Sequence, residues 1–384
     1  MMSLAECCEI ISGATPKTGV ASYWDGDIDW VTPADLSDLD GPFIDETPRK
    51  ITKAGLASCS ATVLPVGAVL LSSRAPIGHV AIALRPMATN QGFKSLIPRA
   101  EVVDPKYLYH WLRTNKSHLQ SLGNGATFKE LSKAAVARIE IPVPDLGEQR
   151  RIAAILDQAD LLRAQRRQAL AHIDDLIQSI FLDMFGDPMT NPRGLPRRPL
   201  GEWGRVTTGN TPPRVEVDNY GLGVEWIKSD NLSSGAMYAS RAAERLSPTG
   251  EEKARVVPAG SILVTCIAGS PNSIGNCALV DRPVAFNQQI NALTLQSADP
   301  HFVWAQLRVG KGLIQEKSTG GMKGLVNKSA FSSVHLLDAP QEEQLRFAKL
   351  IGAVDAARHR LIVSSQVLGE LQRAVRNVAF GGRI

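Results

Sequence analysis

The sequence has few cysteines and no long run of apolar residues. Its five cysteines are an odd number among 384 residues, and no two of them form a C-x-x-C pair. This pattern argues against a disulfide framework and against a zinc site, so we expect reduced, half-buried thiols. No stretch approaches the roughly 18 consecutive apolar residues of a membrane-spanning helix, and residues 1–10 contain no basic cluster. The sequence therefore predicts no transmembrane helix, no signal peptide and a cytoplasmic location without membrane contact.

Sequence motifs for catalysis are missing as well. There is no G-x-x-x-x-G-K-[ST] phosphate loop and no H-E-x-x-H zinc motif. No N-P-P-Y-like amino-methylation tetrapeptide is present, because residues 191–194 (N-P-R-G) and 210–213 (N-T-P-P) lack the aromatic residue. The adjacent Cys7 and Cys8 have no histidine near them in the sequence, which favours core packing over nucleophilic catalysis. The sequence predicts no catalytic residue, no metal site and no cofactor bound by this chain.

The charge is distributed unevenly along the chain. The formal net charge is only +4, but residues 1–46 hold ten acidic side chains against Lys17 alone. Residues 47–138 reverse this balance, with thirteen lysines and arginines against three acidic residues. Two interpretations remain open: the segments form differently charged solvated surfaces, or the second segment faces a polyanion.

A heptad-like apolar pattern runs through residues 145–184 and returns in residues 342–378. In both segments the apolar residues recur about every 3.5 positions, which is the period of a coiled-coil seam. Proline stands on both sides of the first segment but not within it, so we expect one helix of about 55 Å. A helix this long cannot bury its own apolar stripe, and the second segment supplies a partner for it.

The chain repeats itself at an offset of about 196 residues, half of its length. Each copy begins with a turn of the S-G-x-T-P type and ends at a Glu-Gln pair before a long helix. The matching segments are residues 12–16 and 208–212, 29–37 and 225–233, 90–91 and 287–288, and 148–149 and 343–344. The sequence therefore predicts two copies of one unit, each with a globular domain of about 140 residues and a helix of about 37.

Each globular part mixes strand and helix signals. The expected strands of the first copy are residues 63–71, 79–84 and 139–143. Residues 104–122 are expected to form a helix, because Asp104 can cap its start and Pro105 occupies the first turn. Residues 301–313 occupy the same place in the second copy. Both copies are thus expected to be α+β domains.

Several motifs follow one another in the first half and return in the second. They are S-G-x-T-P at residues 12–16, D-W-V-T at 29–32, L-S-S-R-A-P-I-G at 71–78, N-Q-G-F at 90–93, the turn of Gly125, Thr127 and Lys129, and I-P-x-P-x-x-x-E-Q at 141–149. With these motifs the whole chain resembles the specificity subunit of type I restriction-modification systems. The resemblance implies two target recognition domains that each read one half of a bipartite DNA sequence. It also implies binding to two modification subunits, which carry the S-adenosylmethionine site, and to two ATP-driven restriction subunits.

The fold implied in this way is α+β, with two pseudo-symmetric target recognition domains separated by a pair of long antiparallel coiled-coil helices. The expected boundaries are residues 1–145 for the first domain, 146–184 for the central helix, 185–340 for the second domain and 341–384 for the C-terminal helix. The preferred function is a non-catalytic subunit that recognises double-stranded DNA in a modification and restriction complex. A non-catalytic scaffold or interaction protein of the same architecture, without specific DNA binding, remains the alternative.

Candidate DNA contacts are polar and basic residues in glycine- or proline-rich turns, where backbone can approach phosphate and side chains can reach base edges. They are Lys17, Arg74, Asn90, Gln91, Lys94, Thr127 and Lys129 in the first half, and Arg214, Lys228, Asn231, Asn287, Gln288, Lys323 and Lys328 in the second. Lys129 and Lys323 follow glycine-rich turns and suit phosphate better than bases. The Asn-Gln pairs occur in both halves, so side-chain bonding within a turn competes with a role in base contact.

The two halves differ where base contacts are expected. R-A-P at residues 74–76 is replaced by C-I-A-G-S-P at residues 266–271, and N-Q-G-F is replaced by N-Q-Q-I at residues 287–290. The resemblance therefore implies that the two domains read different bases.

Overall fold

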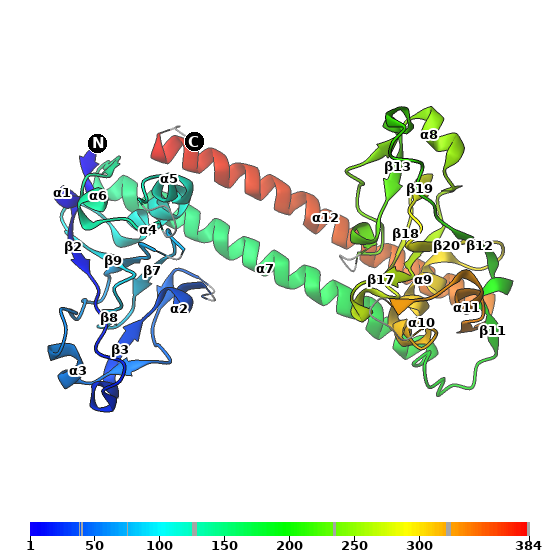
Figure 1. Ribbon diagram of the computed structural model, residues 1–384, viewed down its shortest axis with the longest axis horizontal. Coiled ribbons are helices and arrows are strands. Elements are labelled where there is room, and N and C mark those ends of the chain that lie inside the picture. Colours follow the sequence, from blue (N-terminus) through cyan, green and yellow to red (C-terminus); the bar gives the residue numbers. More distant parts are fainter. Residues whose placement is uncertain are drawn as a thin grey trace. The chain divides into compact units, whose positions relative to one another are not determined.

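The computed structural model describes residues 1–384 except 38, 40, 75, 125–128, 233–235, 320–323 and 382–384, and residue 174 without its side chain. The chain forms two compact units. Unit 1 consists of Met1–Gln165 and Ser364–Ile384, and unit 2 of Arg166–Val363. Each unit holds one α+β domain and one half of each of two long helices, α7 (Leu146–Phe185) and α12 (Gln341–Phe380) (Figure 1).

Two sheets form most of the domain in unit 1. The larger sheet has the strand order β2 (Cys8–Ser12), β9 (Lys94–Pro98), β6 (Val69–Leu71), β7 (Val80–Ala83) and β4 (Phe43–Ile44). The smaller has the order β5 (Lys50–Ile51), β3 (Trp24–Val31) and β8 (Ala88–Thr89), and a separate pair joins β1 (Met2–Ser3) to β10 (Glu140–Ile141). The helices are α1 (Leu4–Cys7), η1 (Ala21–Tyr23), α2 (Pro33–Ser37), α3 (Lys53–Ala57), α4 (Pro105–Thr114), α5 (Lys116–Ser121) and α6 (Lys133–Ala137).

The domain in unit 2 has the same plan. Its main sheet has the order β12 (Gly204–Thr208), β20 (Ile290–Leu295), β16 (Ile262–Thr265) and β18 (Cys277–Leu279). A second sheet has the order β14 (Arg245–Leu246), β13 (Tyr220–Ile227), β19 (Val284–Phe286) and β15 (Val256–Val257), with two further pairs, β17 (Ile267–Ala268) with β21 (Gly324–Leu325) and β11 (Arg197–Pro199) with β22 (His335–Leu337). The helices are η2 (Leu200–Glu202), η3 (Val217–Asn219), η4 (Ser229–Leu232), α8 (Pro248–Lys253), η5 (Pro271–Ser273), α9 (Pro300–Val309), α10 (Lys311–Gln315) and α11 (Lys328–Ser332).

The strand pairing repeats from one domain to the other, as the sequence predicts. Ile10 and Val206 each lie opposite a leucine in the antiparallel pairs of β2 with β9 and of β12 with β20. Trp30 and Trp226 each lie opposite an alanine in the parallel pairs of β3 with β8 and of β13 with β19. Because corresponding residues have corresponding partners, the α+β prediction holds for both halves.

The expected elements of the first domain need two corrections. The three expected strands are longer than the observed ones, since β6, β7 and β10 cover only parts of them. The expected helix at residues 104–122 is two helices, α4 and α5, because Asn115 between them leaves the helical conformation at φ −94° and ψ 22°. Its side chain donates to the carbonyl of Trp111 at 2.9 Å, a local bond of the kind that lets asparagine end a helix.

Both long helices are present with 40 residues each, slightly longer than the helices of about 37 that the sequence predicts. Asp145 starts α7, because its Oδ1 accepts the backbone N–H of Glu148 at 3.0 Å. Gly186 ends it with a φ of +79°, a left-handed conformation that glycine adopts without strain, and its N–H donates to the carbonyl of Leu182 at 2.9 Å. The proline-free interval between these two residues is therefore one continuous helix.

A buried glutamine attaches the first turn of each long helix to the domain before it. Gln149 is fully buried; its Oε1 accepts the N–H of Asp104 at 2.9 Å, and its Nε2 donates to the carbonyls of Val102 and Pro144. Gln344 holds α12 in the same way, since its Oε1 accepts the N–H of the corresponding residue, Asp299, at 3.3 Å. Asp104 and Asp299 are the N-caps of α4 and α9, so each domain fixes its long helix to its own main helix.

In unit 1 the last turns of α12 lie along α7 in the antiparallel direction. Nε2 of Gln372 donates to Asp160 at 2.7 Å, while Phe380 packs on Tyr107 with ring centroids 5.5 Å apart. Asp160 also accepts a bond from Arg113 of α4 at 2.6 Å. The contact between the two helices here is thus partly polar and is shared with the domain.

In unit 2 the corresponding contact is aromatic. Phe181 and Phe185 of α7 pack on Phe302 of α9 and on Phe347 of α12, with ring centroids between 4.8 and 5.9 Å apart. All four side chains are fully buried. The end of α7 is therefore part of the core of the second domain.

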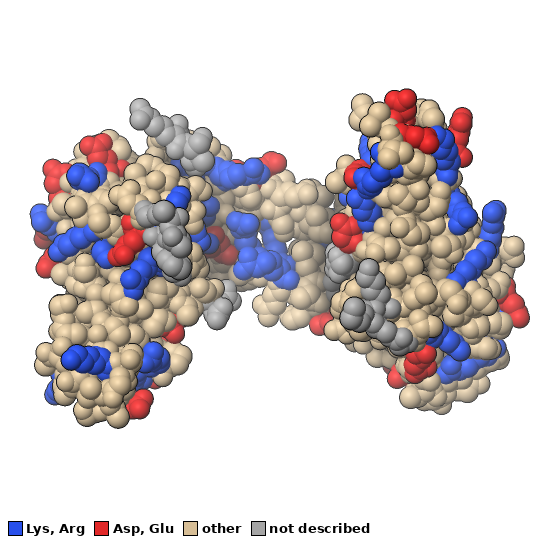
Figure 2. Space-filling view, viewed as in Figure 1, with Lys and Arg blue, Asp and Glu red and all other residues tan. Residues whose placement is uncertain are grey.

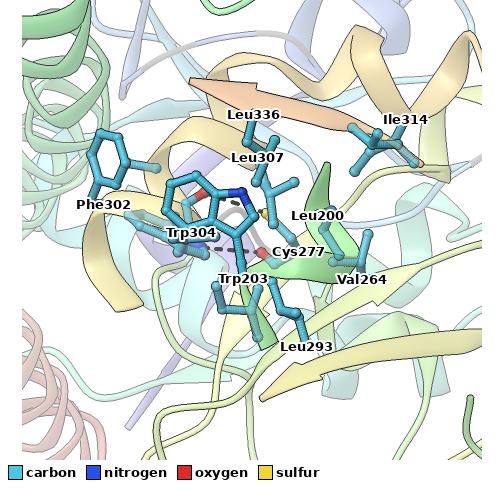
Figure 3. Packing of buried hydrophobic residues seen from close by; sticks show 14 of the residues in the cluster. Leu200, Trp203, Val264, Cys277, Leu293, Phe302, Trp304, Leu307, Ile314 and Leu336 are labelled. Carbon is cyan, nitrogen blue, oxygen red and sulfur yellow. Dashed lines mark hydrogen bonds between the residues drawn. The ribbon is translucent and has the colours of Figure 1, made fainter. Parts of the chain in front are cut away.

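This core continues around two tryptophans (Figure 3). Trp203 and Trp304 are fully buried, and Nε1 of Trp304 donates to the carbonyl of Cys277 at 3.4 Å. Burial raises the pKa of the Cys277 thiol to about 12. All five cysteines are free. The expected half-burial holds for Cys59, whereas the other four lie buried in the core.

Within the described ranges, none of the helices combines the length and the apolar character that crossing a membrane requires.

Glu225 offers a pH-dependent test of the second domain. Its carboxylate, 8% exposed, accepts bonds from Arg282 at 2.6 Å, from Arg241 at 3.0 Å and from the N–H of Ala242 at 3.0 Å. Burial by itself raises the pKa of Glu225, but these bonds outweigh it and lower the pKa from 4.5 to about 2. Because the folded-state pKa lies below the unfolded one, the stabilisation is present above pH 4.5 and is lost as the pH falls toward 2.

We expect Glu225→Gln to lower the free energy of unfolding by about 3 kcal/mol at pH 7, since Arg282 loses its buried partner. The difference from wild type should shrink as the pH falls from 4.5 toward 2. Denaturant unfolding followed by circular dichroism across this range measures it. Glu216→Gln is the control, because the pair of Glu216 with Lys253 is solvent-exposed and its loss should matter much less. A Glu225→Gln effect of the same size at every pH contradicts the assignment.

Candidate nucleic-acid interface

An asparagine shapes the same turn in each domain. Oδ1 of Asn90 accepts the N–H of Gly92 at 2.8 Å, and Oδ1 of Asn287 accepts the N–H of Gln289 at 3.1 Å. Asn287 is buried and Asn90 is partly buried. Of the two open interpretations, this geometry favours side-chain bonding within the turn for both asparagines.

The glutamine that follows each asparagine is exposed. A threonine hydroxyl from the S-G-x-T-P-like turn donates to its Oε1, from Thr15 to Gln91 and from Thr211 to Gln288. These bonds tie two polar turns together at the same place in both domains. Each glutamine keeps its side-chain NH₂ group as a donor.

The first domain brings three candidate cations close to Glu130. Arg74 pairs with Glu130 through an antiparallel backbone bridge, and Nζ of Lys94 lies 3.3 Å from Oε1 of Glu130. The Lys94 side chain is only 9% exposed, so this ion pair holds it inside the domain. Lys129, next to Glu130, is exposed. Within the described residues, Arg74 and Lys129 are in no ion pair, so they are the candidate cations near Glu130 that remain available.

Lys17 lies in the turn that carries Thr15. Its side chain is exposed, and its carbonyl accepts the indole N–H of Trp24 at 3.3 Å. Thr127 and Lys323 are outside the described residues.

The second domain arranges its candidate cations on an aromatic pair. The Arg214 guanidinium lies 5.2 Å from the ring centroid of Tyr220 and 5.3 Å from that of Trp226, and Nζ of Lys228 lies 5.2 Å from the Trp226 ring. Both cations pair with Glu244, at 3.1 and 2.6 Å. Their hydrogen bonds lower the pKa of Glu244, Arg214 contributing the larger part. Because one carboxylate serves both cations, this cluster keeps one net positive charge.

Asn231 is committed to its own loop. Its Oδ1 accepts the N–H of Lys228 at 2.9 Å, and its Nδ2 donates to Oγ of Ser240 at 3.0 Å and to the carbonyl of Arg241. Lys328 is exposed at the first position of α11, away from this loop in the sequence, and lines a groove beside β12.

One cation of the interface was missed in the sequence. The Arg49 guanidinium lies 4.2 Å from the ring centroid of Trp24 and 5.1 Å from that of Trp30. The N–H of Trp30 donates to the carbonyl of Arg49, and the N–H of Trp226 donates to that of Glu244, both at 3.1 Å. Arg49 therefore occupies the place of Glu244. Arg49 lies in the basic segment 47–138, which the sequence marks as a candidate polyanion-facing surface. No spacing rule in the sequence links Arg49 to Trp24 and Trp30.

Acidic and basic side chains are mixed on the visible surface. Figure 2 shows red and blue side chains next to one another in the upper part of unit 2, around α8 and β13. Ion pairs of this region include Arg214 with Glu244 and Lys253 with Glu216. Among the described residues, no three His, Cys, Asp or Glu side chains form a cluster that could hold a metal ion.

Comparison with known proteins identifies relatives of this chain. The family model of the type I restriction modification DNA specificity domain matches residues 1–172. The chain is 33% identical over 249 residues to the type I restriction enzyme MjaIX specificity subunit of Methanocaldococcus jannaschii, covering 60% of this chain and 57% of that protein. It is 26% identical over 167 residues to the EcoR124I/EcoR124II specificity subunit of Escherichia coli, covering 42% and 40%. The chain thus spans about half the length of these curated relatives.

Two solved structures have a similar fold. A chain from a structure of complex assembly and conformational transition in the type I R-M system matches with a TM-score of 0.61 and 19% identity, covering 100% of this chain and 97% of the other. The S subunit of a type I restriction-modification system from M. genitalium matches with a TM-score of 0.57 and 11% identity, covering 100% and 96%. Residues 1–172 thus match the specificity domain of type I restriction-modification systems, and the repeated domains with their two long helices have the fold of these two solved structures.

Proposed function

We propose that this chain is the DNA-recognition subunit of a type I restriction-modification complex, and that each domain reads one half of a bipartite double-stranded target. The observation that carries the proposal is a shared framework with different charged groups on it. Thr15 with Gln91 and Thr211 with Gln288 form the same link in both domains. Around this link, Arg49 in one domain takes the place of Glu244 in the other. Two copies of one scaffold with different contact groups suit the reading of two different sequences.

We infer that the chain is non-catalytic and acts with partners. Its sequence has no phosphate-loop, zinc-protease or amino-methylation motif, so methylation and cleavage would be done by other subunits. We propose two modification subunits and two restriction subunits as those partners. The repeat supports paired binding, because Gln149 and Gln344 present the start of a long helix in the same way in each half.

The direct test is the target sequence of the reconstituted complex. The full chain with its modification subunits should methylate random DNA at one split, asymmetric sequence, detected by methylation-sensitive sequencing. Replacing residues 1–145 with the domain of another family member should change one half-site only, and replacing residues 185–340 should change the other. Methylation without a bipartite motif would instead favour a scaffold role, and a change in both half-sites would refute separate reading.

Lys129 and Lys94 form a matched pair of variants, since Lys94 pairs with Glu130, the neighbour of Lys129. The log of the binding constant falls linearly with the log of the salt concentration. Lys129→Ala should make this slope less steep by about 0.9, as the loss of one phosphate contact does. Its stability should stay within about 0.5 kcal/mol of wild type, because the side chain is exposed. Lys94→Ala should instead lower the stability by about 1 to 3 kcal/mol, because Glu130 loses a bond to a buried cation. A Lys129→Ala variant with the wild-type salt slope contradicts the phosphate assignment.

The long helices are proposed to set the distance between the half-sites. Seven residues added after Gln165 in α7 and seven added before Ser364 in α12 leave the core of each unit unchanged. One heptad keeps the seam in register and adds about 10 Å, or about three base pairs. The preferred spacer, measured by methylation of a spacer library, should therefore grow by about two to four base pairs. Extension of α7 alone, the control, should impair recognition at every spacing. A folded double-extended protein that prefers the original spacer would refute the ruler.

A further inference from the structure

A groove with a volume of about 540 Å³ lies beside β12, an edge strand of the second domain. Its walls come from β12, from the segment containing β15, from β20 and from the first residue of α11. The polar side chains that line it are Arg205, Thr207, Thr208, Arg255, Thr294 and Lys328. Three cations and three hydroxyl groups thus share one concave surface.

The three cations of this groove are exposed and carry uncompensated charge. In the part of the chain that the structure describes, none of Arg205, Arg255 and Lys328 is in an ion pair, whereas Arg214 and Lys228 of the same domain both pair with a carboxylate. Unpaired like charges around one groove repel one another and attract an anion. The groove therefore suits a negatively charged ligand.

Arg255 is held in position at one end of the groove. Its Nη1 donates to the carbonyl of Thr208 at 2.5 Å, and its backbone N–H donates to Oδ1 of Asn210 at 2.9 Å. Asn210 precedes Thr211, whose hydroxyl donates to Gln288. The groove thus begins next to the candidate interface, and a ligand bound to the turns can continue into it.

The length of the groove favours a chain of anions over one anion. A strand rises about 3.4 Å per residue, so Arg205 and Thr208 are about 10 Å apart along β12. Lys328 belongs to α11, which contacts β12 and η2, the helix that ends three residues before Arg205. A single phosphate group does not span that distance, but successive phosphates of a nucleic-acid strand do.

The first domain lacks this combination of residues. Glu9 lies opposite Ile97 in β2 and β9 at the register where Arg205 lies opposite Thr294 in β12 and β20. Lys133, the first residue of α6, is the counterpart of Lys328. In the first domain Glu9 and Ile97 thus stand where the second domain has Arg205 and Thr294. Within the described residues, this basic groove belongs to the second domain alone.

We propose that the groove of Arg205, Arg255 and Lys328 binds the phosphodiester backbone of duplex DNA beside the second half-site, with no equivalent contact from the first domain. This rests on the proposed function and adds to it an unequal set of contacts: Lys129 gives the first domain a single phosphate contact, whereas the second domain holds the flanking backbone along a groove. Such contacts add affinity for every sequence and carry no base preference.

The test is the salt dependence of target binding by the full chain with its modification subunits. In the variant R205A/R255A/K328A, the negative slope of log binding constant against log salt should become less steep by about 2.7, about 0.9 for each lost contact. The methylated sequence should stay the same. Lys133→Ala, the matched control in the first domain, should leave the slope unchanged. Thermal unfolding checks that the triple variant is folded, and the three single variants, each expected to make the slope less steep by about 0.9, replace it if it is not.

A second arm identifies the ligand. Methylphosphonate linkages that remove backbone charge beside the second half-site should weaken binding of the wild type but not of the triple variant. If the wild-type complex recognises its target and the triple variant has the same salt slope, the groove is refuted and the proposed function stays intact. A wild-type complex without any specific target refutes the function instead, and the slope for random DNA then still tests the groove. If Lys133→Ala makes the slope less steep by as much as Lys328→Ala does, the asymmetry is refuted. If the triple variant keeps the wild-type slope but assembles poorly with the partner subunits, the groove binds an acidic protein surface instead.

Discussion

The buried side-chain amide at the start of each long helix is the contact on which the arrangement of each half depends. Gln149 bonds to the N-cap of α4 and to the carbonyls of Val102 and Pro144, so it joins the start of α7 to a segment 45 residues earlier in the sequence. A buried amide without these partners would cost about 1 to 3 kcal/mol for each unmet group, so only one orientation of helix and domain satisfies it. Gln344 repeats the bond to the N-cap in the second half. The direction in which each long helix leaves its domain therefore follows from hydrogen-bond geometry.

The far ends of the two helices are held by different chemistry, although they occupy corresponding places. In unit 1, Gln372 bonds to both Asp160 and Arg163, while in unit 2 the contact consists of Phe181 and its aromatic neighbours. Burial alone raises the pKa of Asp160, but the bonds from Gln372 and Arg113 outweigh it and keep the carboxylate charged. Exchanging the two helix ends would bury a charge against phenylalanine or leave Asp160 without its amide. Each end thus fits only its own unit.

The long helices and the repeat could be predicted because their signals are local or regularly spaced. The seam period, the flanking prolines and Gly186 determine α7 without reference to the rest of the chain. The state of each candidate cation could not be predicted, because its partner is distant in the sequence: Lys94 is neutralised by Glu130, and Arg214 by Glu244. Arg205 and Arg255 were missed for the same reason, since only the sheet and the loop before β15 bring them together. A basic residue in a turn becomes a candidate contact only when its nearest carboxylate is known.

The two domains keep the same aromatic platform but place their free charge differently. A guanidinium stacks on a tryptophan in both, from Arg49 in the first domain and from Arg214 in the second. Within the described residues Arg49 has no carboxylate partner, whereas Arg214 is paired with Glu244, the residue at the corresponding position. Because Lys228 shares Glu244 with Arg214, both platforms keep one net positive charge. In the described part of the chain, the second domain adds three unpaired cations beside β12, where the first domain has Glu9. Because unpaired cations dominate attraction to a polyanion, these added cations change where one scaffold attracts negative charge without altering its fold.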